Sequence, residues 1–415
     1  MQTAGAAASS RIVVVDVLRA FALFGIIVTH ASDGFLEGQK PSPDFMIFSS
    51  WDAFVLQAEY VLTYGKFYTL FSFLFGLSFA IQMRNAEQKG RAFGGRFVWR
   101  LMVLLLIAIV HAAFFSGDVL MVYALLGLLL LLFRKRKTRT LVITGLILIL
   151  NLPGMLLGTV FSQVAQQPEM QAQIEKSTQE SLENGQITLG EKQRGDAPAL
   201  VKRNLTEGLA AKLAFLIITG RLWVTFGLFL LGIAAGRLEI FRDSPENREL
   251  FRKMLWRAAP IALITSLGVI LMPFNYLPLN GKELGGYISM SLQQVSLSAV
   301  YLAAVTLLFW RKPAGVLSQL APMGKMGLTT YVSQTVFGLL VFYGFGLGLL
   351  GSVGVAASIG YSLLFFAVQV LLSIWWLKHF SMGPLEWLWR ALTYFTWQPA
   401  RAEGPRAASG VRSGP

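Results

Sequence analysis

The chain has 415 residues, of which 54% are hydrophobic and only 14% are charged, and its formal net charge is +14. Soluble domains carry roughly 25% charged residues, so this composition excludes an ordinary soluble protein, and the absence of cysteine excludes disulfides and thiolate metal sites. Three histidines are too few for a histidine-rich metal cluster. The long apolar runs do not alternate with polar residues, so they predict an all-α, polytopic membrane protein.

The first apolar segment, over about residues 12–31, is long enough to cross a bilayer and still keeps two charges. Asp16 and Arg19 are three residues apart on one face of the predicted helix, and His30 lies at its far end. Either an interfacial pair that fixes the depth of the helix or a functional site explains these charges. The segment is too long and too charged for a cleaved signal peptide, so we expect it to be retained.

Nine further apolar segments follow, which makes about ten transmembrane helices in total. We expect them at about 66–83, 98–114, 118–133, 140–160, 217–236, 258–274, 287–310, 326–346 and 354–377. An interfacial helix precedes the first of these, at about 51–64. Lysine and arginine gather in alternate connections, which places both termini in the cytoplasm and explains the positive net charge without nucleic acid.

The sequence divides into four parts. Residues 1–160 and 209–398 each form a helical bundle of about five spans. The polar stretch 161–208 between them is expected to be an extracytoplasmic loop with a helix at about 164–184. The last part, residues 399–415, is a basic tail whose composition is typical of disorder.

His111 ends the third segment and Asp118 begins the fourth. The short turn between these segments allows the two side chains to come within hydrogen-bond range, and an imidazole held by a carboxylate is a general base. The alternative is purely structural. Asp118 stands at a helix start, where a carboxylate is favoured as a cap, and His111 is then an interfacial histidine.

Arg221 lies near one end of the sixth segment, and its role stays open between three alternatives. The guanidinium could pair with Asp118 or hold an anionic substrate. It could equally extend to the phosphate headgroups of the bilayer.

Two polar motifs occur in the last third of the chain. Residues 323–334 combine Gly, Thr and Ser with Gln334, which favours close helix packing with interhelical hydrogen bonds. Residues 383–390 predict a short interfacial helix on which Glu386 and Arg390 form an i,i+4 pair.

Four motifs give the chain a resemblance to a known family. They read RxxxxDxLRxFALxGI at Arg11–Ile26, H…GDxLxxYALxG at His111–Gly127, MGxMGLTTYxxQ at Met323–Gln334 and FxxGPLEWLWRxLTY at Phe380–Tyr394. With these motifs the chain resembles the YeiB-like bacterial inner-membrane proteins, whose C-terminal half is domain of unknown function 418. The resemblance covers nearly the whole chain and implies a multi-pass protein of the bacterial cytoplasmic membrane.

That family is similar to the transmembrane acyltransferases, including the lysosomal enzyme that acetylates heparan glucosamine. The similarity implies transfer of an acyl group from a cytoplasmic acyl-CoA co-substrate to an extracytoplasmic small-molecule acceptor, with a histidine as the essential group and no metal. His111 with Asp118 is the preferred candidate. His30 is the second, because the family more often has asparagine there.

The residues expected to bind the acyl-CoA gather at the cytoplasmic ends of the first and ninth segments. Arginine and lysine suit the phosphates of the coenzyme. The set comprises Arg11, Asp16, Arg19, Lys325 and Gln334.

Two other functions fit the same sequence. A transporter or exporter of a small polar or lipidic molecule would use broken helices near the membrane centre. A structural or partner-binding membrane protein would use the charged motifs only as anchors. The lipid bilayer is the one partner that the composition implies, and the sequence is also compatible with a homodimer.

Overall fold

The computed structural model describes residues 12–37, 40–42, 44–90, 92–272 and 281–397. Within these ranges the protein is helical and has no strand. The first half comprises α1 (Val13–Ala31), α2 (Ser50–Leu62), α3 (Phe67–Gln88), α4 (Gly94–Phe114), α5 (Leu120–Phe133), α6 (Thr138–Ile149), α7 (Leu152–Val164), α8 (Pro168–Arg194) and α9 (Ala197–Arg203). A π-helical turn (Asn204–Gly208), α10 (Leu209–Ile218), α11 (Arg221–Arg237), α12 (Pro245–Leu271), α13 (Gly281–Arg311), a 3₁₀ turn (Val316–Leu320), α14 (Ala321–Lys325), α15 (Gly327–Phe342), α16 (Val355–His379) and α17 (Pro384–Tyr394) complete it.

Seven helices of the described chain are long and apolar enough to cross a membrane, and the bent pair formed by α10 and α11 raises the number to as many as eight. Two shorter apolar helices, α5 and α15, run beside them. The chain is therefore a helical membrane protein, as its composition predicts. Both the tail at 399–415 and Arg11 lie outside the described residues.

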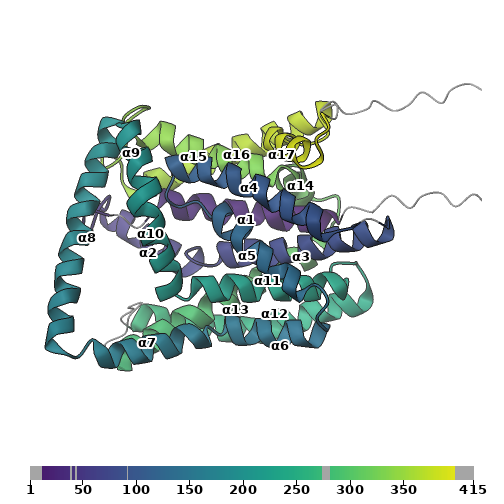
Figure 1. Ribbon diagram of the computed structural model, residues 1–415, viewed down its shortest axis with the longest axis horizontal. Coiled ribbons are helices and arrows are strands. Elements are labelled where there is room, and N and C mark those ends of the chain that lie inside the picture. Colours follow the sequence, from purple (N-terminus) through teal and green to yellow (C-terminus); the bar gives the residue numbers. More distant parts are fainter. Residues whose placement is uncertain (1–11, 38–39, 43, 91, 273–280, 398–415) are drawn as a thin grey trace, which may run out of the picture.

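Helix α1 occupies the centre of the bundle and packs against α3, α13, α14, α15 and α16 (Figure 1). Most of its side chains are buried, because apolar residues occur on every face of the helix. The helix runs from Asp16 at one end of the bundle to His30 at the other. We refer to these ends as the Asp16 end and the His30 end.

Glycines bring several helices into close contact. A Cβ on Gly76 of α3 would lie 2.0 Å from the Phe229 carbonyl oxygen of α11, and one on Gly232 would lie 2.1 Å from that of Phe73. On Gly324 of α14, a Cβ would lie 1.7 Å from the Asp16 carbonyl oxygen of α1. Small residues at such positions let helix backbones pack closely without side chains between them.

Helix α8 crosses the His30 end of the bundle, roughly at right angles to the other helices (Figure 1). The sequence predicts a helix at about 164–184, but α8 extends to Arg194. Its last turns bind the bundle, because Gln193 Nε2 donates to the Leu350 carbonyl oxygen at 3.0 Å. The Gly344 amide donates in turn to the Lys192 carbonyl oxygen at 2.8 Å.

At the Asp16 end, the short helix α17 contacts the start of α15. The predicted pair between Glu386 and Arg390 is wrong, because Glu386 turns inward and accepts hydrogen bonds from the Leu328 amide at 2.7 Å and the Thr329 amide at 3.2 Å. The Thr329 hydroxyl also donates to this carboxylate, at 2.5 Å. Glu386 therefore satisfies amides of the first turn of α15, where the helix dipole also favours a carboxylate.

Candidate functional site

A cavity of about 880 Å³ opens near the His30 end of the bundle. Its walls come from α1, α2, α3, α5, α10 and α11, and Ser181 of α8 lies at its edge. The charged and titratable residues that line it include His30, Asp33, Glu37, Lys40, Glu59, Asp118, Lys212 and Arg221. A cavity of this size suits a ligand of several hundred daltons.

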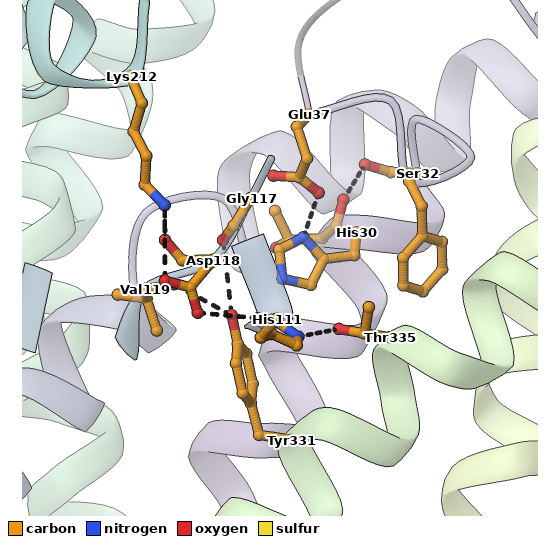
Figure 2. Close-up of polar contacts among 12 residues, drawn as sticks. His30, Ser32, Glu37, His111, Gly117, Asp118, Val119, Lys212, Tyr331 and Thr335 are labelled. Atoms are coloured by element: carbon orange, nitrogen blue, oxygen red, sulfur yellow. Dashed lines mark hydrogen bonds and ion pairs between the residues drawn. The ribbon is translucent and has the colours of Figure 1, made fainter. Parts of the chain in front are cut away.

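His30 and Glu37 face this cavity together (Figure 2). His30 Nδ1 lies 2.7 Å from Glu37 Oε1, and the side chain of His30 keeps 14% of its surface exposed. Among the described residues, no hydrogen bond engages His30 Nε2. An imidazole with one nitrogen beside a carboxylate and the other directed to a cavity is an arrangement that can accept a proton from a bound acceptor.

The pKa of Glu37 lies below its ordinary value. Burial alone would raise it, but the charge of His30 and the hydrogen bond to it, together with the charges of Lys192 and Lys212, outweigh burial. Glu37 is therefore ionised at neutral pH and can stabilise a positive charge on the His30 ring.

The segment that carries Glu37 has an unusual backbone. Gly34, Phe35 and Glu37 all have positive φ angles, of 63°, 63° and 57°. This conformation is costly for a residue with a bulky side chain and persists where the surroundings enforce it. Phe35 is fully buried, and its carbonyl oxygen accepts hydrogen bonds from Lys192 Nζ at 3.3 Å and from the Tyr343 hydroxyl at 3.1 Å. These contacts hold Glu37 in place beside His30.

His111 and Asp118 meet as the hairpin predicts. His111 Nδ1 lies 2.8 Å from Asp118 Oδ1, and His111 Nε2 lies 2.9 Å from the Thr335 hydroxyl of α15. Both ring nitrogens are thus engaged, and only 5% of the His111 side chain is exposed. Asp118 lines the cavity, but His111 lies behind it and does not.

Asp118 also acts as a cap, which was the structural alternative. Its carboxylate accepts hydrogen bonds from the Leu120 amide at 3.2 Å and the Met121 amide at 2.9 Å, at the start of α5. Lys212, rather than Arg221, supplies the neighbouring cation, with Nζ 3.8 Å from Asp118 Oδ2 and a further hydrogen bond to the Asp118 carbonyl oxygen. This network fixes the turn between α4 and α5.

Phe115 separates the two imidazoles. Its ring packs perpendicular to that of His30, with 5.1 Å between ring centroids, and lies 5.8 Å from that of His111. Tyr331 completes this wall, because its hydroxyl accepts a hydrogen bond from the Val119 amide at 3.2 Å. The two histidines therefore belong to one packed cluster (Figure 2), and of the two only His30 lines the cavity.

Arg221 lies at the break between α10 and α11, where the chain bends by 70°. The guanidinium packs over the rings of Tyr64, Tyr68 and Phe215, at 5.1, 5.0 and 4.9 Å from their centroids. Gly220 before it has a φ of 70°, and a Cβ there would lie 2.0 Å from Asn151 Oδ1. The break places Arg221 in the cavity wall.

Glu59 is a functional candidate that the sequence reasoning missed. The sequence places it in the interfacial helix expected at about 51–64, yet only 5% of it is exposed, and it lines the cavity. Its Oε1 accepts hydrogen bonds from the hydroxyls of Thr29 at 2.9 Å and Thr63 at 2.5 Å. The position of Glu59 in the interfacial helix α2, facing threonines, was the available signal.

The residues predicted to bind acyl-CoA lie elsewhere. Arg19 Nη1 bonds Asp16 at 2.7 Å, and its Nη2 donates to the Ser78 hydroxyl, also at 2.7 Å. Asp16, Arg19 and Lys325 stand at the opposite end of α1 and do not line the cavity. Gln334 donates to the Leu23 carbonyl oxygen at 3.3 Å and to Gln369 at 3.2 Å, which is the helix-packing role that its motif favours.

No cluster of three or more ligating side chains in the described part of the chain could hold a metal ion. The charged and titratable groups that line the cavity include one imidazole, four carboxylates, two lysine ammonium groups and one guanidinium. Such a set can bind a charged ligand and move a proton.

Comparisons with known proteins place the chain among relatives of the same length. Residues 235–396 match the family model described as "Protein of unknown function (DUF418)". The chain is 33% identical to the uncharacterized protein YxaH of Bacillus subtilis (strain 168), over 94% of this chain and 96% of the relative. It is 25% identical to the uncharacterized protein YeiB of Escherichia coli (strain K12), over 95% and 98%. No solved structure matches it.

Proposed function

The chain belongs to the YeiB-like DUF418 family, and on that basis we propose that it is an integral acyltransferase of the bacterial cytoplasmic membrane. The observation that carries this proposal is the His30–Glu37 pair, which presents a free imidazole nitrogen to a large cavity. The resemblance to transmembrane acyltransferases supplies the reaction class. The seven long helices, the bent pair and the two shorter apolar helices support a multi-pass protein, and ten spans with both termini in the cytoplasm are part of the proposal.

In this proposal, His30 Nε2 removes the proton of an acceptor hydroxyl or amine. The acceptor oxygen or nitrogen then bonds to the carbonyl carbon of the acyl thioester, the carbon–sulfur bond breaks, and the thiolate of coenzyme A takes the proton from the imidazolium. Glu37 stabilises the charged ring between these two transfers. His111 and Asp118 act as positioning residues that hold the wall behind His30, so the assignment of the base changes from the first candidate to the second.

Acyl-CoA remains the proposed acyl donor. Its phosphates would meet Arg19 and Lys325 at the Asp16 end, on the cytoplasmic side. The acceptor would enter the cavity from the other side of the membrane.

The test is transfer of label from radioactive acetyl-CoA to an extract of membrane and periplasmic acceptors by the purified protein. We expect His30→Ala to lower transfer at least 100-fold, in the range general-base catalysis supplies. His379, which is exposed on the last turn of α16, provides the matched control His379→Ala. Full transfer by His30→Ala would contradict the proposal.

A transporter is the second candidate, and one observation favours it. The α10–α11 break, with a π-helical turn before α10, lies in the cavity wall and resembles the discontinuous helices of secondary transporters. Uptake or efflux of a ligand by proteoliposomes without acyl-CoA would support this function over acyl transfer.

A further inference from the structure

The cavity is electrically bipolar. One part of its wall carries Glu59, held by the hydroxyls of Thr29 and Thr63. Another part carries Arg221, within a cage formed by Tyr64, Tyr68 and Phe215. Both charges line the same space of about 880 Å³, and neither belongs to the His30–Glu37 pair.

The two charges have different surroundings. The hydroxyls of Thr29 and Thr63 both bond to Oε1 of Glu59. Lys66 interacts electrostatically with Glu59, but its Nζ donates to the Tyr60 carbonyl oxygen at 2.8 Å, and no salt bridge joins the two among the described residues. A carboxylate that has lost most of its water in this way favours a ligand ammonium, which can donate several hydrogen bonds.

Arg221 is suited to an anion. Packing against three aromatic rings fixes the plane of its guanidinium, and a fixed, planar donor set binds phosphate or carboxylate oxygens in pairs. The residue is also the first of α11, whose dipole adds a positive potential at the same place. Each pole of the cavity thus selects one charged group of a ligand.

We propose that the cavity binds an aminoalkyl phosphate, with its ammonium at Glu59 and its phosphate at Arg221. This inference rests on the proposed function and names the acceptor class, a primary amine beside a phosphate. Glu59 and His30 line the same cavity, so the bound ammonium would lie near the imidazole. The ammonium first gives one proton to water, and His30 takes the second as the nitrogen bonds to the acyl carbon. The chemistry is shared by free phosphoethanolamine and by the headgroup of phosphatidylethanolamine.

The test measures binding by the purified full-length protein without acyl-CoA, as the shift in its thermal unfolding temperature across a concentration series. The probes are O-phosphoethanolamine, ethanolamine and methyl phosphate. We expect phosphoethanolamine to bind at least tenfold more tightly than either fragment. Equal affinity for phosphoethanolamine and one of its fragments would overturn the proposal, and this comparison needs no variant.

Variants then test which residue binds which charged group of the ligand. Glu59→Gln and Arg221→Gln should each weaken phosphoethanolamine at least tenfold, whereas Arg221→Lys, which keeps the charge, should weaken it less than Arg221→Gln. The exposed residues Glu180 and Arg252 supply the controls Glu180→Gln and Arg252→Gln. If folded Glu59→Gln and Arg221→Gln proteins bind like wild type, the assignment is overturned.

The source of the ligand is distinguished in nanodiscs of phosphatidylcholine with and without phosphatidylethanolamine. Stabilisation by the lipid identifies the headgroup as the ligand, and stabilisation by the soluble compound alone identifies free phosphoethanolamine; both support the bipolar site, and the absence of both overturns it. His30→Ala separates this inference from the proposed function, because it should lower acyl transfer at least 100-fold while phosphoethanolamine still binds through Glu59 and Arg221.

Discussion

At the residue scale, the chemistry depends on which imidazole is available. Both nitrogens of His111 are engaged, by Asp118 and Thr335, whereas His30 has one nitrogen beside Glu37 and the other toward the cavity. The strained backbone at Phe35 and Glu37 indicates that the surrounding contacts hold this carboxylate in a costly position. The two histidines thus have different surroundings: His30 lines the cavity, and His111 is held within the wall.

A single methyl group tests the position of Glu37. A Cβ on Gly117 would lie 2.3 Å from the Glu37 carboxylate carbon, so Gly117→Ala should displace that carboxylate from His30. We expect acyl transfer to fall about tenfold or more, since an unsupported base is less effective. Gly95 has open space around its Cβ position, and Gly95→Ala is the matched control. Equal activity of the two variants would show that Glu37 does not assist His30.

At the element scale, a half-buried carboxylate joins two motifs that are 50 residues or more apart in sequence. Glu386 of α17 accepts hydrogen bonds from the first turn of α15. Helix α15 also contributes Tyr331 and Thr335 to the wall behind His30. Burial raises the pKa of Glu386, although the hydrogen bonds from Thr329 and Leu328 oppose the rise. Helix α15 therefore connects the Asp16 end with the site.

Loss of this cap should lower stability. We expect Glu386→Gln to reduce the free energy of unfolding by about 1–2 kcal/mol, since the neutral amide accepts hydrogen bonds more weakly than the carboxylate. The measurement is thermal unfolding in detergent. If Glu386 were instead paired with Arg390 at the surface, Arg390→Gln would lower the free energy of unfolding as much as Glu386→Gln does. That result would contradict the capping role.

The docked end of α8 carries a buried lysine. Burial lowers the pKa of Lys192 to about 8, although the nearby acidic residues Asp33, Glu37 and Glu191 oppose the change. Its ammonium donates to the Phe35 carbonyl oxygen and lies 5.1 Å from the centroid of the Tyr343 ring. A charged lysine in this position is a cost to the folded state.

Because the folded protein binds this proton less tightly than the unfolded chain, stability should rise with pH between about 8 and the ordinary lysine pKa near 10.4, by about 3 kcal/mol. Lys192→Met should remove this rise and be the more stable protein below pH 8. Unfolding temperatures from pH 7 to 10 measure the difference, with the exposed Lys176→Met as control. Parallel curves for wild type and Lys192→Met would contradict a buried, protonated lysine.

Some of these features could be predicted from the sequence, and others could not. Hydropathy locates the helices, and the short turn after α4 predicts the contact of His111 with Asp118. Neither hydropathy nor the turn reveals which side chain faces a cavity. The direction of a side chain depends on helices distant in sequence, such as α15, whose Thr335 contacts His111. The sequence puts Glu59 and Glu386 on interfacial helices and Lys192 in a polar loop. Tertiary contacts nevertheless bury Glu59 and Lys192 and turn Glu386 towards α15.

At the scale of the whole molecule, the proposed acyl transfer requires the Asp16 end and the His30 end of the bundle to lie on opposite sides of the membrane. The chain contains no cysteine, so single-cysteine variants report position without a background. Ser181→Cys at the cavity edge should react with a membrane-impermeant maleimide on intact cells. Lys135→Cys, in the connection between α5 and α6, should react only after permeabilisation. The reverse pattern would invert the proposed topology.

The central claim, that His30 rather than His111 is the available imidazole, is tested most directly by chemical modification. Diethyl pyrocarbonate acylates free imidazole nitrogens, and mass spectrometry of the purified protein resolves the rates at its three histidines. We predict modification of His30 and of the exposed control His379, with His111 protected until the protein unfolds. Modification of folded His111 at the rate of His30, or faster, would contradict the account.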